Sequence, residues 1–290
     1  MLSVIILSYN TKELTLGCLE HVFESKNVDL EVIVVDNAST DGSVEAIEKK
    51  YEDIKILRNE KNNGFAAGNN QAIKVARGDK FLLLNSDCFV KSDTLAMIYN
   101  LNLDVVGCKL LNKDGSVQPS WGFYPTLRRV TQLMLFVDNF PVIRKFIDSI
   151  NVRDVSRYER GQEVDWVTGA FVMLKREVFE KVGGIDEKYF MYGEEMEWMY
   201  RIKKAGFKVW YSPIASATHL LGASSKNRAP AVIGEMKGWV YWFAKHNPVW
   251  QQKILAWIIL GGCLLRVILK PGLSKYYYQA IFEIFGRSRR

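Results

Sequence analysis

A chain of 290 residues is long enough for one large α/β domain with an appendage, or for two modest domains. Its composition, 48% hydrophobic and 24% charged, excludes a disordered, collagen-like or coiled-coil protein. The net charge of +7 comes from the end of the chain, because residues 245–290 carry eight basic side chains and one acid. This distribution indicates an anionic partner for the C-terminal segment and no nucleic-acid groove across the main domain.

The first hundred residues alternate apolar runs with helical spacing. Strands are predicted at 2–7, up to residue 35, at 54–59 and at 81–84, with helices at 11–23, near 44–51 and after a Gly- and Asn-rich loop within 62–76. Strands separated by helices form right-handed crossovers. The sequence therefore predicts a mostly parallel central sheet with helices on both faces.

The middle of the chain, residues 101–163, is less regular. A turn at 113–115 predicts a hairpin or edge strand, and residues 126–140 predict a helix or loop-helix over the site. Regular structure returns with a strand at 169–175 and a helix that ends at Gly183 and Gly184. A further helix ends at Gly206, and the strand after it is expected to end at Pro213.

The most apolar stretch is residues 254–269, "ILAWIILGGCLLRVIL". Sixteen residues with Arg266 inside are too few to cross a bilayer upright, which takes about 20. Its basic and Trp flanks favour a segment that lies on an anionic membrane surface or enters one leaflet, together with the rest of 250–290. A helix docked on the core, or an oligomer interface, is the alternative. We divide the chain into a main domain, 1–245, and a membrane-associating segment, 246–290.

The four cysteines are far apart and form no C-x-x-C pair, which favours reduced thiols over disulfides or a zinc site. The N-terminus lacks the basic region and long apolar run of a signal peptide. We therefore expect the main domain at the cytoplasmic face of a membrane, as a peripheral or monotopic protein. A homo-oligomer is left open.

Three polar clusters follow predicted strands: Ser8-Tyr9-Asn10, Asp36-Asn37 and Asn85-Ser86-Asp87. In open α/β sheets such ends line one crevice, where ligands bind. The chain has neither a Gly-rich dinucleotide loop nor a P-loop, so a nucleotide there would be held by side chains, with its diphosphate neutralised by a metal. Asp87 supplies an oxygen ligand that Mg²⁺ or Mn²⁺ prefers; on its own it could equally begin a turn or cap a helix.

Six stretches in this order resemble family 2 glycosyltransferases with the GT-A fold, in particular the bacterial rhamnosyltransferase-like branch. They are "SVIILSYN", "VIVVDNASTDGS", "NNGFAAGNNQAI", "LLLNSD", "WVTGAFVMLKREVFEKVGGIDEKYFMYGEEMEW" and "ATHLLGAS", and they cover about residues 2–225. The resemblance implies inverting, metal-dependent transfer of a sugar from a nucleoside diphosphate sugar. It also implies a GT-A type nucleotide-diphospho-sugar transferase fold, here followed by C-terminal apolar and amphipathic helices.

On the donor side, the resemblance assigns Asp36 and the 8–10 backbone to the nucleotide base. Gly64 and Asn69 match the loop near ribose and base, although Gly64 could be a plain turn glycine. Asn85-Ser86-Asp87 matches the D-x-D motif, with Asp87 as metal ligand and Asn85 in place of the first carboxylate. His219 matches a position near metal and diphosphate; a lone structural histidine is the alternative.

On the acceptor side, "GEEMEW" matches the segment that supplies the general base, which an inverting displacement needs. Glu195 stands at the usual aspartate position, and Glu194 competes with it. Trp166, Thr168, Gly169 and Ala170 match the wall of the sugar and acceptor pocket, although Trp166 could be a core residue. Arg201 could pair with phosphate or only with nearby acids.

These residues predict an enzyme that adds one sugar to a lipid-linked or polysaccharide acceptor in cell-envelope glycan synthesis. The branch favours dTDP-rhamnose as donor, with UDP-hexoses next. The departures at Asn85 and Glu195 support a second hypothesis, a non-catalytic sugar-nucleotide-binding or scaffolding subunit of a glycan assembly complex.

Overall fold

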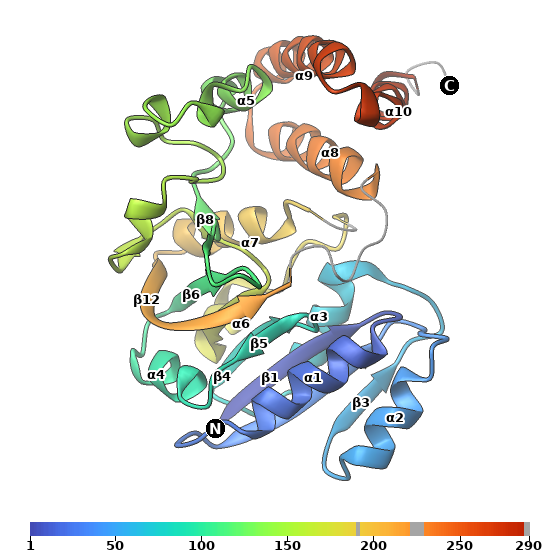
Figure 1. Cartoon of the computed structure of the whole chain (residues 1–290), viewed down its shortest axis with the longest axis vertical. Coiled ribbons are helices and arrows are strands. Elements are labelled where there is room, and N and C mark those ends of the chain that lie inside the picture. Colours follow the sequence, from blue (N-terminus) through green and yellow to red (C-terminus); the bar gives the residue numbers. More distant parts are fainter. Residues whose placement is uncertain (190–191, 221–228, 287–290) are drawn as a thin grey trace.

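The computed structural model describes residues 1–189, 192–220 and 229–286. Residues 190–191 and 221–224, which belong to two of the quoted stretches, and the basic residues Arg287, Arg289 and Arg290 lie outside the described residues. At the centre is a mixed sheet with strand order β3-β2-β1-β4-β11-β6-β12-β5 (Figure 1). The strands are β1 (Leu2–Ser8), β2 (Leu30–Asp36), β3 (Lys55–Arg58), β4 (Lys80–Asn85), β5 (Cys88–Val90), β6 (Val105–Leu111), β7 (Val117–Gln118), β8 (Trp121–Gly122), β9 (Gln162–Glu163), β10 (Trp166–Val167), β11 (Phe171–Lys175) and β12 (Val209–His219).

The helices cover both faces of this sheet and extend beyond it at one end of the molecule. They are α1 (Lys12–Phe23), α2 (Ser43–Lys50), α3 (Gly64–Val75), α4 (Thr94–Asn100), α5 (Leu127–Met134), α6 (Arg176–Val182), α7 (Glu194–Lys204), α8 (Ala229–His246), α9 (Val249–Leu269) and α10 (Ser274–Phe285). Short 3-10 helices occur at Val137–Asn139, Ile143–Lys145, Val155–Tyr158 and Pro271–Leu273.

The mostly parallel sheet is confirmed. β1 pairs in parallel with β2 and β4, β2 with β3, and β6 with β12, whereas β11 is antiparallel to both its neighbours and β5 is antiparallel to β12. Neighbouring residues of β1 point to opposite faces, as the two-residue repeat of a strand requires. Ile5 packs in the core that contains α3 and α7, and Ile6 in the core that contains α1 and α4.

Two expected boundaries are wrong. β12 does not end at Pro213 but continues to His219, because its pairing with β6 shifts between Ser212 and Ser216. Such a bulge accommodates a proline that a regular ladder excludes. The loop expected within 62–76 is helical from Gly64 onward, since the Asn and Gly side of α3 is held by tertiary contacts, including the Asn70 side chain at Ile185.

The C-terminal helices form a separate layer above the sheet (Figure 1). α9 packs against α5, α8 and α10, so the helix expected over the site lies instead in this layer. Among the described residues, α9 is the helix long and apolar enough to span a membrane by length and composition. It is 21 residues long because it begins before the apolar stretch, at Val249. The division at residue 245 stays a prediction.

Candidate functional site

The polar clusters after β1, β2 and β4 meet at one edge of the sheet. In the parallel register, Ser8 lies opposite Asp36, and Leu7 lies opposite Asn85. The carboxyl ends of these strands therefore present their polar residues together, where open α/β sheets bind ligands.

The exits of β1 and β2 are tied to each other by hydrogen bonds. The Asn10 backbone, with φ of 53°, donates to Ser39 Oγ (2.9 Å), and Asn10 Oδ1 accepts from the Thr40 backbone N–H (2.8 Å). Asp36 is buried, and its Oδ2 accepts from the Ser39 backbone N–H (2.9 Å). Its buried Oδ1 has no hydrogen-bond partner in the described part of the chain. Asp36 thus keeps one acceptor atom for a ligand, beside the exposed ring of Tyr9.

The next loop reaches this edge through Asn37. Its Nδ2 donates to the carbonyl of Gly64 and to Asn62 Oδ1, both at 3.3 Å. Gly64 begins α3 with φ of +81°, a conformation that glycine adopts without strain. Asn69 lies one turn further along α3 and is buried, with its Nδ2 donating to the Phe65 carbonyl (2.9 Å).

A group of buried hydroxyls joins the exits of β1 and β4. Ser8 Oγ lies 3.3 Å from Thr11 Oγ1 and 3.1 Å from Thr15 Oγ1, and Thr11 Oγ1 lies 3.3 Å from Ser86 Oγ. Thr11 and Thr15 were not predicted as site residues, because their spacing is that of an ordinary first helical turn. They fix the position of the residue before Asp87.

Asp87 and His219 face each other in the interior. Asp87 Oδ1 lies 3.2 Å from His219 Nε2, and both side chains are buried. The other ring nitrogen, Nδ1, lies 2.7 Å from Gln118 Oε1, while Gln118 Nε2 donates to the His219 carbonyl and to Asn112 Oδ1. The two carbonyl partners fix the amide, so its Oε1 accepts a hydrogen bond from the Nδ1–H of His219, and Nε2 faces Asp87.

Asp87 Oδ1 and His219 Nε2, 3.2 Å apart, can share either a proton on Nε2 or a cation between them, and the Asn85 amide, whose Nδ2 lies 3.4 Å from Nε2, adds only a long contact. A divalent cation held by one carboxylate and one imidazole, completed by waters and substrate phosphates, fits this pair. No group of three or more His, Cys, Asp or Glu side chains that could hold a metal occurs among the described residues. Gln118, which orients the histidine, lay in the irregular region and carried no motif that would have revealed it.

The acidic pair opens α7 on the other side of the crevice. Tyr192 and Gly193 have φ of 75° and 94°, so two residues in the left-handed conformation immediately precede the helix. Glu194 is buried and Glu195 half-buried, and one carboxylate oxygen of each lacks a hydrogen-bond partner within the described residues. Burial raises the pKa of both carboxyls, and the charge of Glu195 raises that of Glu194 further.

A short segment connects the two sides of the crevice. The Ala170 carbonyl accepts from the Asn85 backbone N–H (3.1 Å), and the adjacent Gly169 backbone lies beside the Glu195 carboxyl and lowers its pKa. A Cβ on Gly169 would lie 2.9 Å from the Phe65 ring, so this approach requires glycine. The exit of β4 and the start of α7 therefore flank one pair of residues.

Trp166 and Thr168 precede this pair. Trp166 is buried in the core, with its Nε1 donating to the Phe123 carbonyl (3.4 Å), which fits the core alternative for this residue. Thr168 is half-buried, and its backbone N–H donates to the Ser120 carbonyl (2.8 Å).

Arg201 contacts an acid and two carbonyls. Its Nε donates to both oxygens of Glu197 (2.9 and 3.2 Å), and its terminal nitrogens donate to the carbonyls of Val182 and Gly184. These contacts fit the alternative in which Arg201 pairs only with nearby acids. We therefore leave it out of the proposed function.

Glu197, a fully buried carboxylate, links α7 to α8. Besides Arg201, Lys245 Nζ lies 2.8 Å and His246 Nε2 3.3 Å from its Oε1. The His246 ring also packs on Tyr200, with centroids 4.6 Å apart. Lys245 and His246 lie where we divided the chain, and no motif or spacing indicated that they support the helix of the acidic pair.

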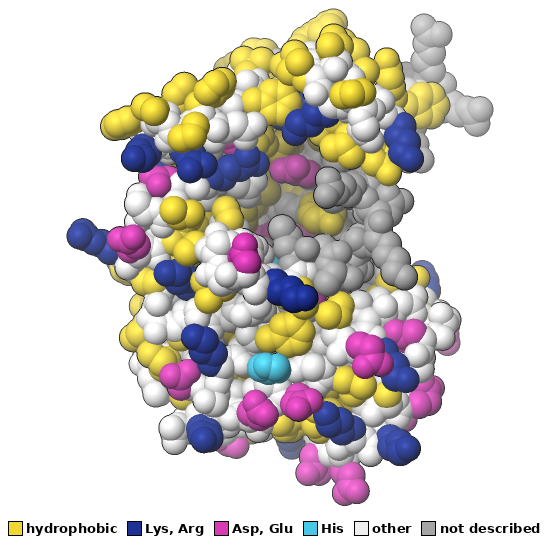
Figure 2. Space-filling view, viewed as in Figure 1, with side chains coloured by type: hydrophobic (Ala, Val, Ile, Leu, Met, Phe, Trp, Pro, Cys, Tyr) yellow, Lys and Arg dark blue, Asp and Glu magenta, His cyan; other side chains and the backbone are white. Residues whose placement is uncertain are grey.

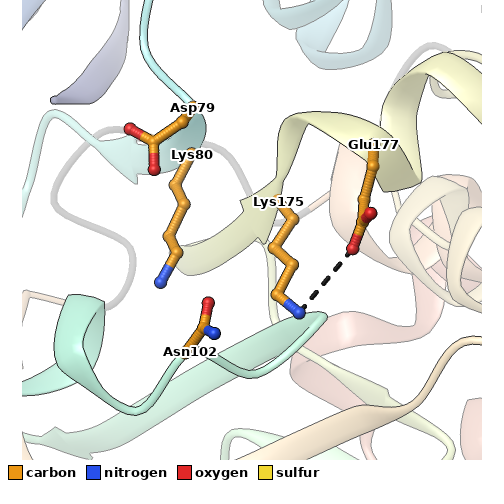
Figure 3. A pocket seen from close by; sticks show the side chains of 5 residues that line it. All are labelled: Asp79, Lys80, Asn102, Lys175 and Glu177. Atoms are coloured by element: carbon orange, nitrogen blue, oxygen red, sulfur yellow. Dashed lines mark ion pairs between the residues drawn. The ribbon is translucent and has the colours of Figure 1, made fainter.

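A separate pocket of about 340 Å³ lies at the opposite end of β4 (Figure 3). Lys80, which begins β4, donates to the Tyr99 carbonyl (2.5 Å), and burial lowers the pKa of its ammonium. Lys175 pairs with Asp104 (3.0 Å). Lys80 and Asn85 are separated by five steps of a strand, about 17 Å. This pocket is therefore no part of the crevice.

The chain is similar to known proteins in sequence and in fold. Residues 3–183 match the model of Glycosyl transferase family 2. A curated relative, the N-acetylglucosaminyl-diphospho-decaprenol L-rhamnosyltransferase of Mycobacterium tuberculosis, is 26% identical over 276 residues, which cover 88% of this chain and 89% of that protein.

Two solved structures share the fold. A mannosyltransferase from Pyrobaculum calidifontis, in complex with GDP-Man and Mn²⁺, superposes with a TM-score of 0.60 at 18% identity, covering 99% of this chain and 88% of the other. S. aureus TarS 1-349 in complex with UDP gives a TM-score of 0.55 at 15% identity, covering 100% and 93%.

Proposed function

Because the chain belongs to glycosyl transferase family 2 and has the GT-A fold, we propose that it transfers one sugar, with inversion, to a lipid-linked or polysaccharide acceptor in cell-envelope glycan synthesis. The donor is a nucleoside diphosphate sugar, with dTDP-rhamnose favoured and UDP-hexoses next. The mycobacterial relative, named for rhamnosyl transfer to a diphospho-decaprenol, supports both the sugar and the lipid-linked acceptor.

The base and ribose of the donor bind at the exits of β1 and β2. Asp36 Oδ1, buried and without a described partner, accepts a hydrogen bond from the base. Asn37 and Gly64 close the loop beside it. The tie between Asn10 and Thr40 holds the two exits in fixed relation, so donor binding needs little reorganisation.

Asp87 and His219 would hold Mg²⁺ or Mn²⁺ together with the donor diphosphate. The 3.2 Å approach of His219 Nε2 to Asp87 Oδ1 supports this assignment, because one cation can be held by both atoms when the imidazole is neutral. When bound, the metal neutralises charge on the departing diphosphate. Gln118 keeps the histidine in the tautomer that presents Nε2.

Glu195 acts as the general base, with Glu194 as the competing assignment. The acceptor hydroxyl gives its proton to the carboxylate while its oxygen bonds to the anomeric carbon, and the bond from that carbon to the diphosphate oxygen breaks on the opposite face. Burial raises the pKa of both carboxyls, which makes each a stronger base once ionised.

One observation carries the proposal: residues 169–170 lie between the exit of β4, where the Ala170 carbonyl binds the Asn85 N–H, and the Glu195 carboxyl, whose pKa the Gly169 backbone lowers. A sugar lying over this pair has the metal ligands at its diphosphate end and a proton acceptor at its opposite face. Inverting transfer needs this arrangement, because nucleophile and leaving group occupy opposite faces of one carbon.

The test is a screen of dTDP-rhamnose, UDP-hexoses and GDP-mannose, each with Mg²⁺ or Mn²⁺, against the full chain. Thermal shift reports donor binding, and release of nucleoside diphosphate in the presence of a polyprenyl-diphosphate sugar reports transfer. We expect metal-dependent stabilisation and turnover with one donor class, with inversion established by NMR of the product.

Asp87→Asn should abolish the metal dependence, whereas Asp93→Asn, at an exposed position on the same segment, should behave as the wild type. Donor binding without turnover under every condition would favour the non-catalytic subunit instead.

A further inference from the structure

Exposed apolar side chains are concentrated at one end of the molecule. Of 19 large hydrophobic residues that the described chain exposes, 14 lie within 135–146 or 249–282. The 14 are Leu135, Phe140, Val142, Ile143, Phe146, Val249, Trp250, Ile254, Trp257, Leu264, Ile268, Leu269, Tyr278 and Phe282, and we call them the cap surface. Figure 2 shows hydrophobic side chains along this end of the molecule, over α5 and α9. An exposed patch of this extent marks an interaction site.

α9 has two faces of different use. Leu255, Ile259 and Cys263 are buried against the rest of the helical layer. On the other side, Trp250, Ile254, Trp257, Leu264 and Ile268 recur every three or four residues, or every seven across Gly261, and are exposed. This outer stripe runs along the whole helix, about 27 Å. Half of an apolar helix therefore has no protein partner among the described residues.

Arg266 fixes how α9 lies. Its buried guanidinium donates to the carbonyls of Met134 (2.6 Å), Leu133 (2.7 Å) and Gly262 (3.2 Å), and it packs on the ring of Phe136 at 4.2 Å. These contacts satisfy the last carbonyls of α5 with a charge from α9. To cross a bilayer, α9 would have to leave these partners and carry an unpaired guanidinium into hydrocarbon.

Basic side chains surround the apolar ones. Arg128, Lys145, Lys253, Lys270 and Lys275 are exposed, and none forms an ion pair with a residue that the structure describes. In Figure 2 a band of Lys and Arg lies directly beneath the hydrophobic edge. The apolar and Trp side chains lie at the outer end of the molecule, and the unpaired cations lie next to them, nearer the sheet. This order suits an anionic bilayer, whose apolar interior lies beneath a negatively charged headgroup layer.

We propose that the cap surface binds the headgroup region of an anionic lipid bilayer, with α9 lying flat in the interface and residues 135–146 inserting beside it. The contact thus has two segments, which begin 114 positions apart in the sequence, at residues 135 and 249, and are joined through Arg266. This goes beyond the proposed function, and its tests need no enzymatic activity. A catalytically dead protein would still bind vesicles, and a non-binding protein could still use a soluble acceptor.

The first test is flotation of the full chain with vesicles of phosphatidylcholine alone or with 30% phosphatidylglycerol added. We expect binding mainly to the anionic vesicles, weakened by salt, and about tenfold weaker binding for Phe146→Glu and for Val142→Glu. Both side chains are highly exposed, 83% and 71%, so neither change disturbs packing. The matched control is Ile214→Glu, on β12, with 51% exposure.

Unchanged flotation of both 135–146 variants would overturn the two-segment surface. A fall in oligomeric state with these variants, without loss of vesicle binding, would assign the surface to a second copy of the chain.

The second test distinguishes a flat from a spanning helix. A fluorophore is attached to the new cysteine of the Trp250→Cys, Trp257→Cys or Ile268→Cys variant. Labelling of the folded protein is selective for this cysteine because all four natural cysteines are buried. Lipids with nitroxides at different depths then report the position of each probe. A flat α9 gives the same shallow depth at all three positions, whereas a deep Trp257→Cys probe between two shallow ones would overturn the proposal.

Discussion

On the proposed donor side of the crevice, Asn10, Thr11, Ser86 and His219 are held by hydrogen bonds to their neighbours, and Asp36 keeps one buried oxygen without a described partner. On the proposed base side, Glu194 and Glu195 each keep such an oxygen. The first side is organised before any ligand arrives. The second buries carboxylates where their charged form is poorly solvated, which raises their pKa. Binding a diphosphate needs a rigid frame, while abstracting a proton needs an unsatisfied base.

The largest effect should follow from removing the base. Glu195→Gln should lower kcat by about 10³-fold because the proton of the acceptor loses its destination, with donor affinity unchanged. Glu194→Gln is the matched variant, one residue away and equally isosteric. We expect it to lower kcat by less than tenfold, measured by steady-state transfer and donor titration.

If Glu194→Gln is the inactive variant, the assignments exchange. If both variants keep wild-type kcat, the difference between the two sides of the crevice has no catalytic meaning.

A second prediction concerns the orientation of the histidine. Gln118→Ala frees the Nδ1 of His219, so we expect an apparent metal affinity weaker by about 10- to 100-fold. Saturating Mn²⁺ should restore most of kcat, which a general loss of structure would not permit. Gln279→Ala, at an exposed position on α10, is the control. The measurement is a metal titration of transfer rate, and equal titrations for wild type and Gln118→Ala would exclude this positioning role.

A third prediction tests the free acceptor atom of Asp36. Asp36→Asn keeps the size of the side chain but replaces one acceptor by a donor, which should raise the donor Kd by about tenfold. The kcat should stay at the wild-type value, since the proposed contact of Asp36 is with the base and not with a reacting atom. Calorimetry with the free nucleoside diphosphate measures the change, with the exposed Asp53→Asn as comparison. A shift in kcat alone would place Asp36 elsewhere in the mechanism.

The smallest effect should be a pH-dependent change in stability from Glu235, on α8. Burial raises the pKa of its half-buried carboxyl from 4.5 to about 6, although the charge of Arg266 acts in the opposite direction. The folded state therefore binds this proton more tightly than the unfolded state, and stability falls as the pH rises from about 4.5 to 6. Above pH 6, the charged carboxylate lowers the free energy of unfolding by about 2 kcal/mol or less.

Glu235→Gln removes this titration. Relative to the wild type, its Tm should rise by about 2 to 4 °C more at pH 7.5 than at pH 4.5. Calorimetry at the two pH values measures the difference. A Tm difference that does not vary with pH would show that burial does not penalise this charge.

The meeting of the polar strand ends at one edge of the sheet could be predicted because its signals are local. An apolar run that ends in Asp36 or Asn85 indicates a buried strand whose carboxyl end lies at the edge of a sheet. The alternation of strands and helices predicts that the sheet is mostly parallel. The supports of the site were not predictable, because they depend on contacts between distant segments. Gln118 reaches His219 across 101 residues and Arg266 reaches Leu133 across 133, and neither is marked by spacing or motif. The predicted end of β12 at Pro213 was wrong for a related reason. The bulge that accommodates this proline is visible only in the pairing of β12 with β6.

Glu197 has a consequence for exchanging parts between related enzymes. Its two cationic partners come from different helices, Arg201 from α7 and Lys245 from α8, and both meet a carboxylate with no exposure to solvent. A chimera whose replacement for α8 lacks a basic residue at the position of Lys245 would leave this charge short of a counter-ion, at a cost of several kcal/mol. The helix that carries the acidic pair and the helix beneath the cap surface therefore have to be exchanged together. A chimera that keeps these ion pairs must have its junction before α7.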